Sequence, residues 1–89
     1  MKMNTYDVEV TDTFGGEANY SWAQRFRVHA QSMRGAIIKV SRYMGTQGRL
    51  RKVMDTGDLV RHDVQGAAVC VFTMGYNEQD PLFRRAVQL

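Results

Sequence analysis

The chain has 89 residues, of which 44% are hydrophobic and 24% are charged, and its formal net charge is +3 at pH 7. These proportions are typical of a globular protein and exclude a disordered chain. Because 89 residues can bury one hydrophobic core but not two, we expect a single domain over residues 1–89. A core of this size is marginal on its own, which leaves a homodimer open.

The first elements in the chain are predicted to form an antiparallel hairpin. Apolar residues at positions 6, 8 and 10 alternate with polar residues at 7, 9 and 11, which predicts a strand with one buried face and one face in water. Gly15 and Gly16 supply the positive φ angles that a tight reversal needs. A second alternation begins at Tyr20 and places Trp22 and Phe26 on its apolar side.

A helix is predicted over residues 33–44, where apolar residues recur at steps of three and four. Ser32 is a suitable N-cap, because its hydroxyl can accept a hydrogen bond from a free backbone N–H of the first turn. Gly45 follows the last apolar residue of this pattern and is a suitable C-cap.

The second half of the chain is predicted to form strands. Residues 50–54 and 59–64 have strand character, and whether 50–64 is one strand or a hairpin stays open. Residues 67–74 (AAVCVFTM) predict the most deeply buried strand, and the tail from Tyr76 to Leu89 is not assigned. The fold class is therefore α+β, with one helix packed on an antiparallel sheet of four or five strands in a ββαββ-like order. We expect one core to contain Trp22, Phe26, Ile37, Val40, Val69 and Val71.

The sequence contains no pattern typical of a catalytic, metal or cofactor site. His29 and His62 are 33 residues apart and Cys70 is the only cysteine, so no zinc-binding spacing exists. Asp55 and Asp58 flank Thr-Gly, where aspartate is ordinary turn chemistry. We therefore expect no catalytic residues, no metal and no cofactor, and we predict that the protein is not an enzyme.

The location of the protein is indicated by the lone cysteine and the N-terminus. Cys70 cannot form an intramolecular disulfide, which fits a reducing compartment. The first residues, MKMNTYDVEV, lack the apolar core of a signal peptide, and no segment approaches the length of about 20 apolar residues that spans a membrane. We expect a cytoplasmic protein without a membrane partner.

The positive charge is concentrated in the middle third of the chain. Residues 34–62 contain seven basic and two acidic residues, a net charge of +5, whereas the segments on either side each have a net charge of −1. Such a surface is suited to phosphate backbones or to an acidic protein, and a basic face that is merely solvated is the alternative. The candidate partner-binding residues are Arg34, Lys39, Arg42, Arg49, Arg51, Lys52 and Arg61.

Residues 12–22, DTFGGEANYSW, carry a resemblance to known proteins. The run is similar to one near the N-terminus of small uncharacterised bacteriophage and prophage proteins, and GDLVR at 57–61 resembles a later element of the same group. A structural hairpin anchored in the core by Tyr20 and Trp22 would explain most of this run. Such a hairpin does not explain Glu17 and Asn19, which could hydrogen-bond across the loop or contact a partner.

Two functions remain after these exclusions. The first is a non-catalytic, phage-encoded binding protein that modulates or inhibits a host macromolecule through its basic surface, as an anti-CRISPR-like or other anti-defence factor would. Its partner would be a host protein or a protein–nucleic acid complex in the host cytoplasm. The alternative is a small nucleic-acid-binding module that uses the same basic residues.

Overall fold

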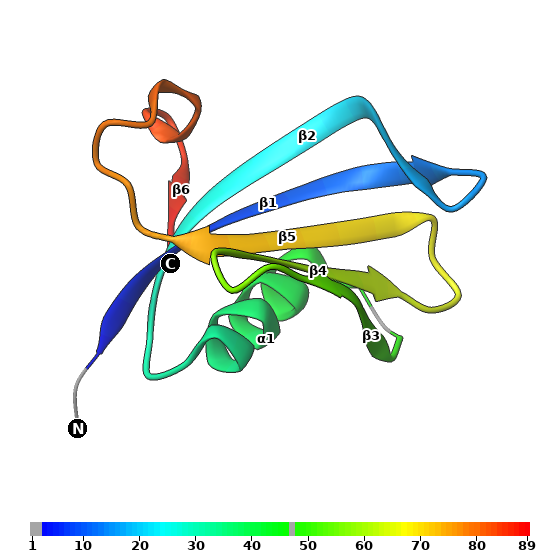
Figure 1. Ribbon diagram of the computed structural model, residues 1–89, viewed down its shortest axis with the longest axis horizontal. Helices are drawn as coiled ribbons and strands as arrows, with labels where there is room; N and C mark the ends of the chain where they lie inside the picture. The colour runs from blue at the N-terminus through cyan, green and yellow to red at the C-terminus, as the bar shows by residue number, and fades with distance from the viewer. Residues whose placement is uncertain (1–2, 47) are drawn as a thin grey trace.

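A computed structural model describes residues 3–46 and 48–89. Six strands form one sheet in the order β3-β4-β5-β1-β2-β6, and every neighbouring pair is antiparallel except β2 and β6, which are parallel (Figure 1). The elements are β1 (Asn4–Phe14), β2 (Glu17–Ala30), α1 (Met33–Met44), β3 (Leu50–Asp55), β4 (Leu59–Val64), β5 (Val69–Gly75), the short 3₁₀ helix η1 (Pro81–Phe83) and β6 (Val87–Gln88).

The predicted α+β class is confirmed, but the sheet is larger than the four or five strands expected and is mixed rather than wholly antiparallel. Residues 50–64 form a hairpin of two strands, β3 and β4, and the unassigned tail adds the two-residue strand β6 beside β2. The backbone N–H of Leu89 donates to the carbonyl of Arg27 (2.8 Å), and the N–H of His29 donates to the carbonyl of Leu89 (3.1 Å). The C-terminus is therefore held against the sheet by backbone hydrogen bonds.

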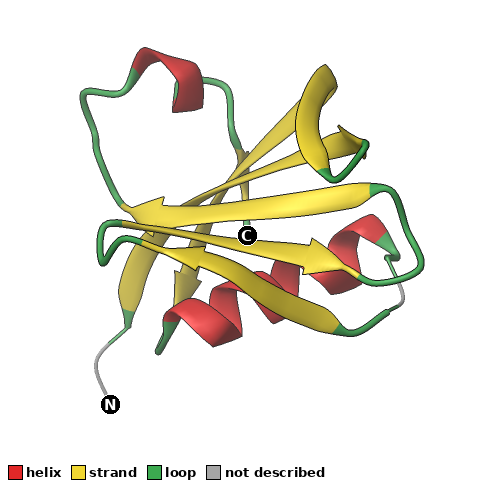
Figure 2. Ribbon diagram, turned by 45° about the vertical axis from the view of Figure 1, so that its right-hand side comes forward, coloured by secondary structure: helices red, strands yellow, loops and turns green. Residues whose placement is uncertain are grey.

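Helix α1 covers one face of the sheet, and the short helix η1 lies away from α1 in the tail that follows β5 (Figure 2). The side chains between the two layers form the core, which includes Val8 and Val10 of β1, Phe26 and Val28 of β2, Ala36, Ile37 and Val40 of α1, and Val71 of β5. The apolar positions of the predicted strands and helix supply this core, because strand residues two apart and helix residues three and four apart share a face.

The core prediction is correct for most of its residues and wrong for Trp22. Phe26, Ile37, Val40 and Val71 are buried in the core, and Val69 packs against it in part. Trp22 is 41% exposed. The reason lies in the burial pattern of β2, whose first seven residues are mostly exposed and whose buried residues begin at Phe26, so the strand is longer than the layer that covers it.

The predicted wet face of β1 is also wrong. Asp7 and Thr11 are fully buried and Glu9 is almost so. Asp7 accepts hydrogen bonds from Nε of Arg27 (2.9 Å) and from the backbone N–H of Asn77 (3.2 Å), and Glu9 accepts one from Nε of Arg25 (2.8 Å). Because β1 is a central strand, cations of its neighbour β2 and the segment after β5 cover its polar side and pair with it.

The predicted ends of the helix are confirmed by its geometry. Ser32 has extended backbone angles and its hydroxyl accepts a hydrogen bond from the N–H of Gly35 (3.1 Å), as an N-cap does. Gly45 adopts the left-handed conformation with φ 70°, and its N–H bonds to a carbonyl of the last turn.

We expect the substitution Ser32→Ala to lower the free energy of unfolding by about 0.5–2 kcal/mol, because the Gly35 N–H would lose its partner. Chemical denaturation monitored by circular dichroism measures this change. The comparison is Ser21→Ala, which removes a hydroxyl outside the helix. This variant should leave the fraying of the helix N-terminus unchanged, as measured by amide exchange of residues 33–36. Equal helix fraying in the Ser32→Ala variant and the parent would contradict the capping role.

Candidate functional site

The face of the sheet opposite α1, called the open face below, combines polar and apolar side chains. The register places Met54 of β3, Arg61 of β4 and Phe72 of β5 in one row across three neighbouring strands, so their side chains share this face. Asp63 lies two residues beyond Arg61 on β4, and therefore on the same face. A register shift between Lys52 and Met54 marks a bulge in β3 at this place.

The far end of the β1–β2 hairpin, residues 12–21 and called the hairpin tip below, is attached to the open face at two points. Nη2 of Arg61 donates to the carbonyl of Gly16 (2.8 Å). The ring of Tyr20 stacks on that of Phe72, with 6.3 Å between the centroids and an interplanar angle of 11°. Tyr20 has a φ of 56°, a left-handed conformation that is uncommon for a residue with a side chain.

Asp12 organises the hairpin tip from within. Its carboxylate accepts hydrogen bonds from the side-chain amide of Asn19 (2.8 Å) and from the backbone N–H (3.0 Å) and hydroxyl of Ser21. These bonds lower the pKa of Asp12 to about 2, from an ordinary value of 3.8. Asn19 thus bonds across the loop, which was one of its two predicted roles.

The aromatic residues of the DTFGGEANYSW run do not lie in the core, where the predicted hairpin anchor would place Tyr20 and Trp22. Tyr20 and Trp22 are 55% and 41% exposed, so neither anchors the hairpin in the core. Tyr20 instead packs on Phe72 of the open face. Glu17 is exposed at the start of β2. Phe14 is 80% exposed at the end of β1. The run therefore presents three aromatic rings at the surface.

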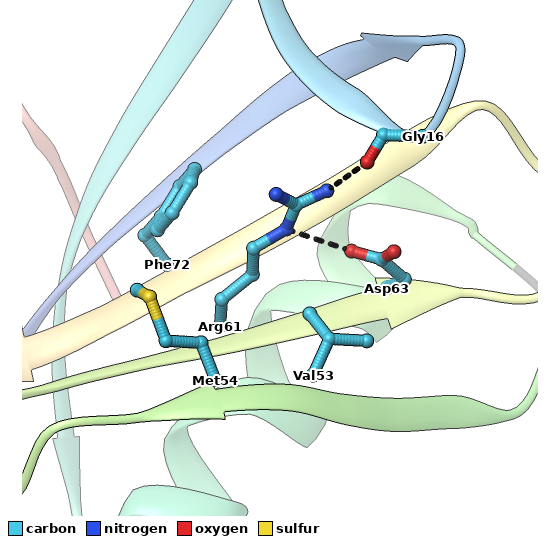
Figure 3. A pocket seen from close by; sticks show the side chains of 6 residues that line it. All are labelled: Gly16, Val53, Met54, Arg61, Asp63 and Phe72. Carbon is cyan, nitrogen blue, oxygen red and sulfur yellow. Dashed lines mark hydrogen bonds and ion pairs between the residues drawn. The ribbon is translucent and has the colours of Figure 1, made fainter.

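A cavity of about 430 Å³ lies between the hairpin tip and the strands β3, β4 and β5 (Figure 3). Nε of Arg61 donates to Oδ1 of Asp63 (2.9 Å), and both side chains line the cavity together with Gly16. The other lining residues are apolar: Val53, Met54 and Phe72. The guanidinium of Arg61 also lies 5.8 Å from the centre of the Phe72 ring.

Three of the seven predicted basic residues make bonds within the chain. Nζ of Lys39 donates to the carbonyl of His29 (2.7 Å), Lys52 pairs with Asp55 (3.2 Å), and Arg61 pairs with Asp63. The Lys52 pair is exposed on both sides, so it contributes little to stability. Within residues 3–46 and 48–89 the structure gives no ion pair to the other four, and all of these are exposed: Arg34, Arg42, Arg49 and Arg51.

The seven basic residues lie on more than one side of the molecule. Arg51 is directly opposite Asp63 in the sheet and shares the open face with Arg61, whereas Lys52 is opposite His62 on the helix side. Arg34 lies near that second pair, since its charge and that of Lys52 add to burial in lowering the pKa of His62 below its ordinary value. Arg51, Lys52 and Arg34 thus border both faces of the β3 edge, whereas Lys39 lies at the carbonyl of His29, near the end of β2.

Cys70, His62 and the acidic side chains are the remaining candidates for chemistry. Cys70 is fully buried, and burial raises the pKa of its thiol, which makes it a poor nucleophile. Nδ1 of His62 is buried without a hydrogen-bond partner and has no nucleophile paired with it in the part of the chain that the structure describes. No group of three His, Cys, Asp or Glu side chains among the described residues is arranged to hold a metal ion.

The apolar walls of the cavity were not anticipated from the sequence. Phe72 lies in the strand predicted to be buried, and Val53 and Met54 lie in a segment whose pairing was left open. The signal that could have found Phe72 was the alternation within 69–75, which puts positions 70, 72 and 74 on the face opposite the core residue Val71.

The protein is thus a small two-layer α+β domain with a cavity on its open face. The chain matches no protein-family model, and no curated protein or solved structure is significantly similar to it. No helix in the described ranges is long and apolar enough to cross a membrane.

Proposed function

We propose that the chain is a non-catalytic binding protein that binds an acidic host macromolecule along the β3 edge of its sheet. The partner that we favour is a protein. One observation carries this proposal. Strand β3 forms an edge of the sheet, five of its six residues are exposed, and it presents Arg51 beside the exposed apolar residues Val53 and Met54, with Arg49 immediately before it.

This mixture of side chains supports a protein partner. Arginine, methionine and aromatic residues are enriched where proteins bind one another, because they bury large areas and still offer hydrogen bonds. The exposed rings of Phe14, Tyr20 and Trp22 belong to the hairpin whose tip contacts the open face. The resemblance of residues 12–22 to phage and prophage proteins is consistent with an inhibitor of a host or defence protein.

The exposed aromatic rings also favour the alternative of a nucleic-acid-binding module. Single-stranded nucleic acids bind surfaces where aromatic rings stack on bases and arginines contact phosphates. We place this function second, because the β3 edge offers valine and methionine rather than aromatic rings beside its arginines. The experiment that tests the proposal therefore includes nuclease treatment.

We expect the double substitution Arg49→Glu and Arg51→Glu to abolish capture of the partner from host lysate while leaving the melting temperature nearly unchanged. Both residues are exposed and have no ion pair in the described part of the chain, so the fold does not depend on them. Tagged parent and variant are compared by pull-down, with captured molecules identified by mass spectrometry.

The matched control is Arg84→Glu with Arg85→Glu, which makes the same charge change next to η1, at the opposite edge of the sheet from β3. This control should capture the partner as the parent does. Capture that is lost after nuclease treatment, and that weakens with a log–log salt slope near −0.9 for each phosphate contact, would support the nucleic-acid module instead. Equal capture by both double variants would contradict the proposed interface.

A further inference from the structure

We propose that the cavity under the hairpin tip binds a carboxylate carried on a compact apolar body. The cavity is formed within one chain, so this inference goes beyond the proposed function and does not require the partner inferred above. The carboxylate could belong to a free small acid or to an acidic residue that has an apolar neighbour in a peptide. Both sources have the same chemistry, and the experiment below distinguishes them.

The size and walls of the cavity suit a small organic ligand. Its volume of about 430 Å³ lies within the range of about 300–1,000 Å³ that is usual for ligand sites. Val53 and Met54 form one wall and are 43% and 37% exposed, so these apolar side chains have little cover in the chain itself. Phe72 forms the opposite wall, and Tyr20 stacks on its ring.

The polar end of the cavity is organised by Arg61. A guanidinium group has five N–H donors, and here Nε bonds to Asp63 and Nη2 bonds to the carbonyl of Gly16. Its third nitrogen takes part in neither bond and is directed into the space in front of Phe72 (Figure 3). Two hydrogen bonds thus hold the group in place before any ligand arrives, which reduces the entropic cost of binding.

The charges around the cavity favour an anion over a cation. On the open face Glu9, opposite Phe72, is paired with Arg25, and Asp63 is paired with Arg61. Arg51, opposite Asp63 on the same face, has no ion pair in the described part of the chain and adds a positive charge to these balanced pairs. The side chain of Arg61 is only 17% exposed, and a charge-assisted hydrogen bond is stronger in such a partly buried setting than in open water. A carboxylate also matches the planar geometry of the guanidinium group.

The test is an NMR titration of the full chain with three probes. We expect 3-phenylpropionate to bind with a Kd on the order of 1 mM, and its neutral analogue 3-phenylpropanamide to bind about tenfold more weakly. Chemical shifts should change at Val53, Met54, Phe72 and the Nε–H of Arg61. The acetylated, amidated dipeptide Asp-Leu is the third probe, and tighter binding of this peptide than of the free acid would indicate a protein source.

Variants at exposed positions provide the control. Met54→Glu places a negative charge on the cavity wall and should weaken binding of 3-phenylpropionate about tenfold or more, whereas Leu82→Glu, also at an exposed apolar residue, should not change it. If Met54→Glu fails to fold, the comparison of acid and amide in the unmodified chain still decides. Equal affinity for acid and amide, shifts confined to other surfaces, or no shifts at about 20 mM probe would overturn the inference.

These outcomes are separate from those of the partner experiment. Partner capture that survives Arg49→Glu with Arg51→Glu, together with acid binding at the cavity, would contradict the proposed function alone. Loss of capture in that variant, together with no acid binding, would overturn the cavity inference alone.

Discussion

Replacing Phe26 by alanine is expected to lower the free energy of unfolding by about 3–5 kcal/mol. Phe26 is fully buried in β2, opposite Val8 of β1, and the ring of Tyr43 packs edge-on against it with 5.4 Å between centroids. Removing the ring would leave a cavity between sheet and helix that neighbours on two rigid elements cannot fill. The total stability of a small domain is of the order of 5–15 kcal/mol, so this change takes a large share of it.

Thermal unfolding measures the effect as a fall in melting temperature of roughly 12 °C or more. The matched control is Trp22→Ala, because Trp22 belongs to the same strand and was predicted for the same core. Since Trp22 is 41% exposed, we expect its truncation to cost about 1 kcal/mol or less. A larger loss for Trp22→Ala than for Phe26→Ala would contradict the placement of the core.

The substitution Asp7→Ala is expected to destabilise the fold by about 3–5 kcal/mol. Asp7 is fully buried, and its loss would leave the Arg27 guanidinium and the N–H of Asn77 without their acceptor. Arg27 also lies over the ring of Tyr76, with its guanidinium carbon 4.6 Å from the ring centre, so the tail after β5 depends on the same cation. Removing one partner of a buried ion pair is costly, because the other charge stays buried without a counter-charge.

The double variant Asp7→Ala with Arg27→Met separates the loss of the pair from the loss of its packing. It should recover much of the stability, because no buried charge remains unpaired. Lys52→Ala serves as the comparison at an exposed pair and should change the free energy of unfolding by about 1 kcal/mol or less. A similar cost for Asp7→Ala and Lys52→Ala in urea denaturation would show that the buried pair is not important for stability.

Local signals in the sequence were sufficient for the helix, its caps and most strands. Ser32 and Gly45 act through backbone geometry within a few residues, so their roles can be recognised without knowing the fold. The same holds for β5, whose apolar run gives a strand with four buried central residues. These features depend on near neighbours in the chain.

The polar face of β1 could not be predicted in the same way. An alternation of apolar and polar residues has the same form whether the polar side meets water or meets cations of the next strand. What decides between them is that β1 lies between β5 and β2, and that Arg27 and Asn77 reach Asp7 from segments 20 and 70 residues away in sequence. Strand order is a long-range property, and the burial of Asp7 follows from it.

The cavity was beyond prediction for a related reason. Its walls come from Gly16, Met54, Arg61 and Phe72, which are brought together only because β4 lies beside β5 and the hairpin tip reaches Arg61. The basic residues of 34–62 form a group in the sequence, but the strand alternation of β3 sends Arg51 and Lys52 to opposite faces. Composition alone cannot assign charges to a surface.

Amide hydrogen exchange of the chain, free and bound to its captured partner, tests the central claim most directly. We expect binding to protect residues 49–54 and the hairpin tip, because the outer backbone groups of the β3 edge and the loop beside the cavity would be covered. Exchange at α1, η1 and β6 should be nearly unchanged. Protection confined to those three elements, with β3 exchanging as in the free protein, would contradict a binding surface at the β3 edge.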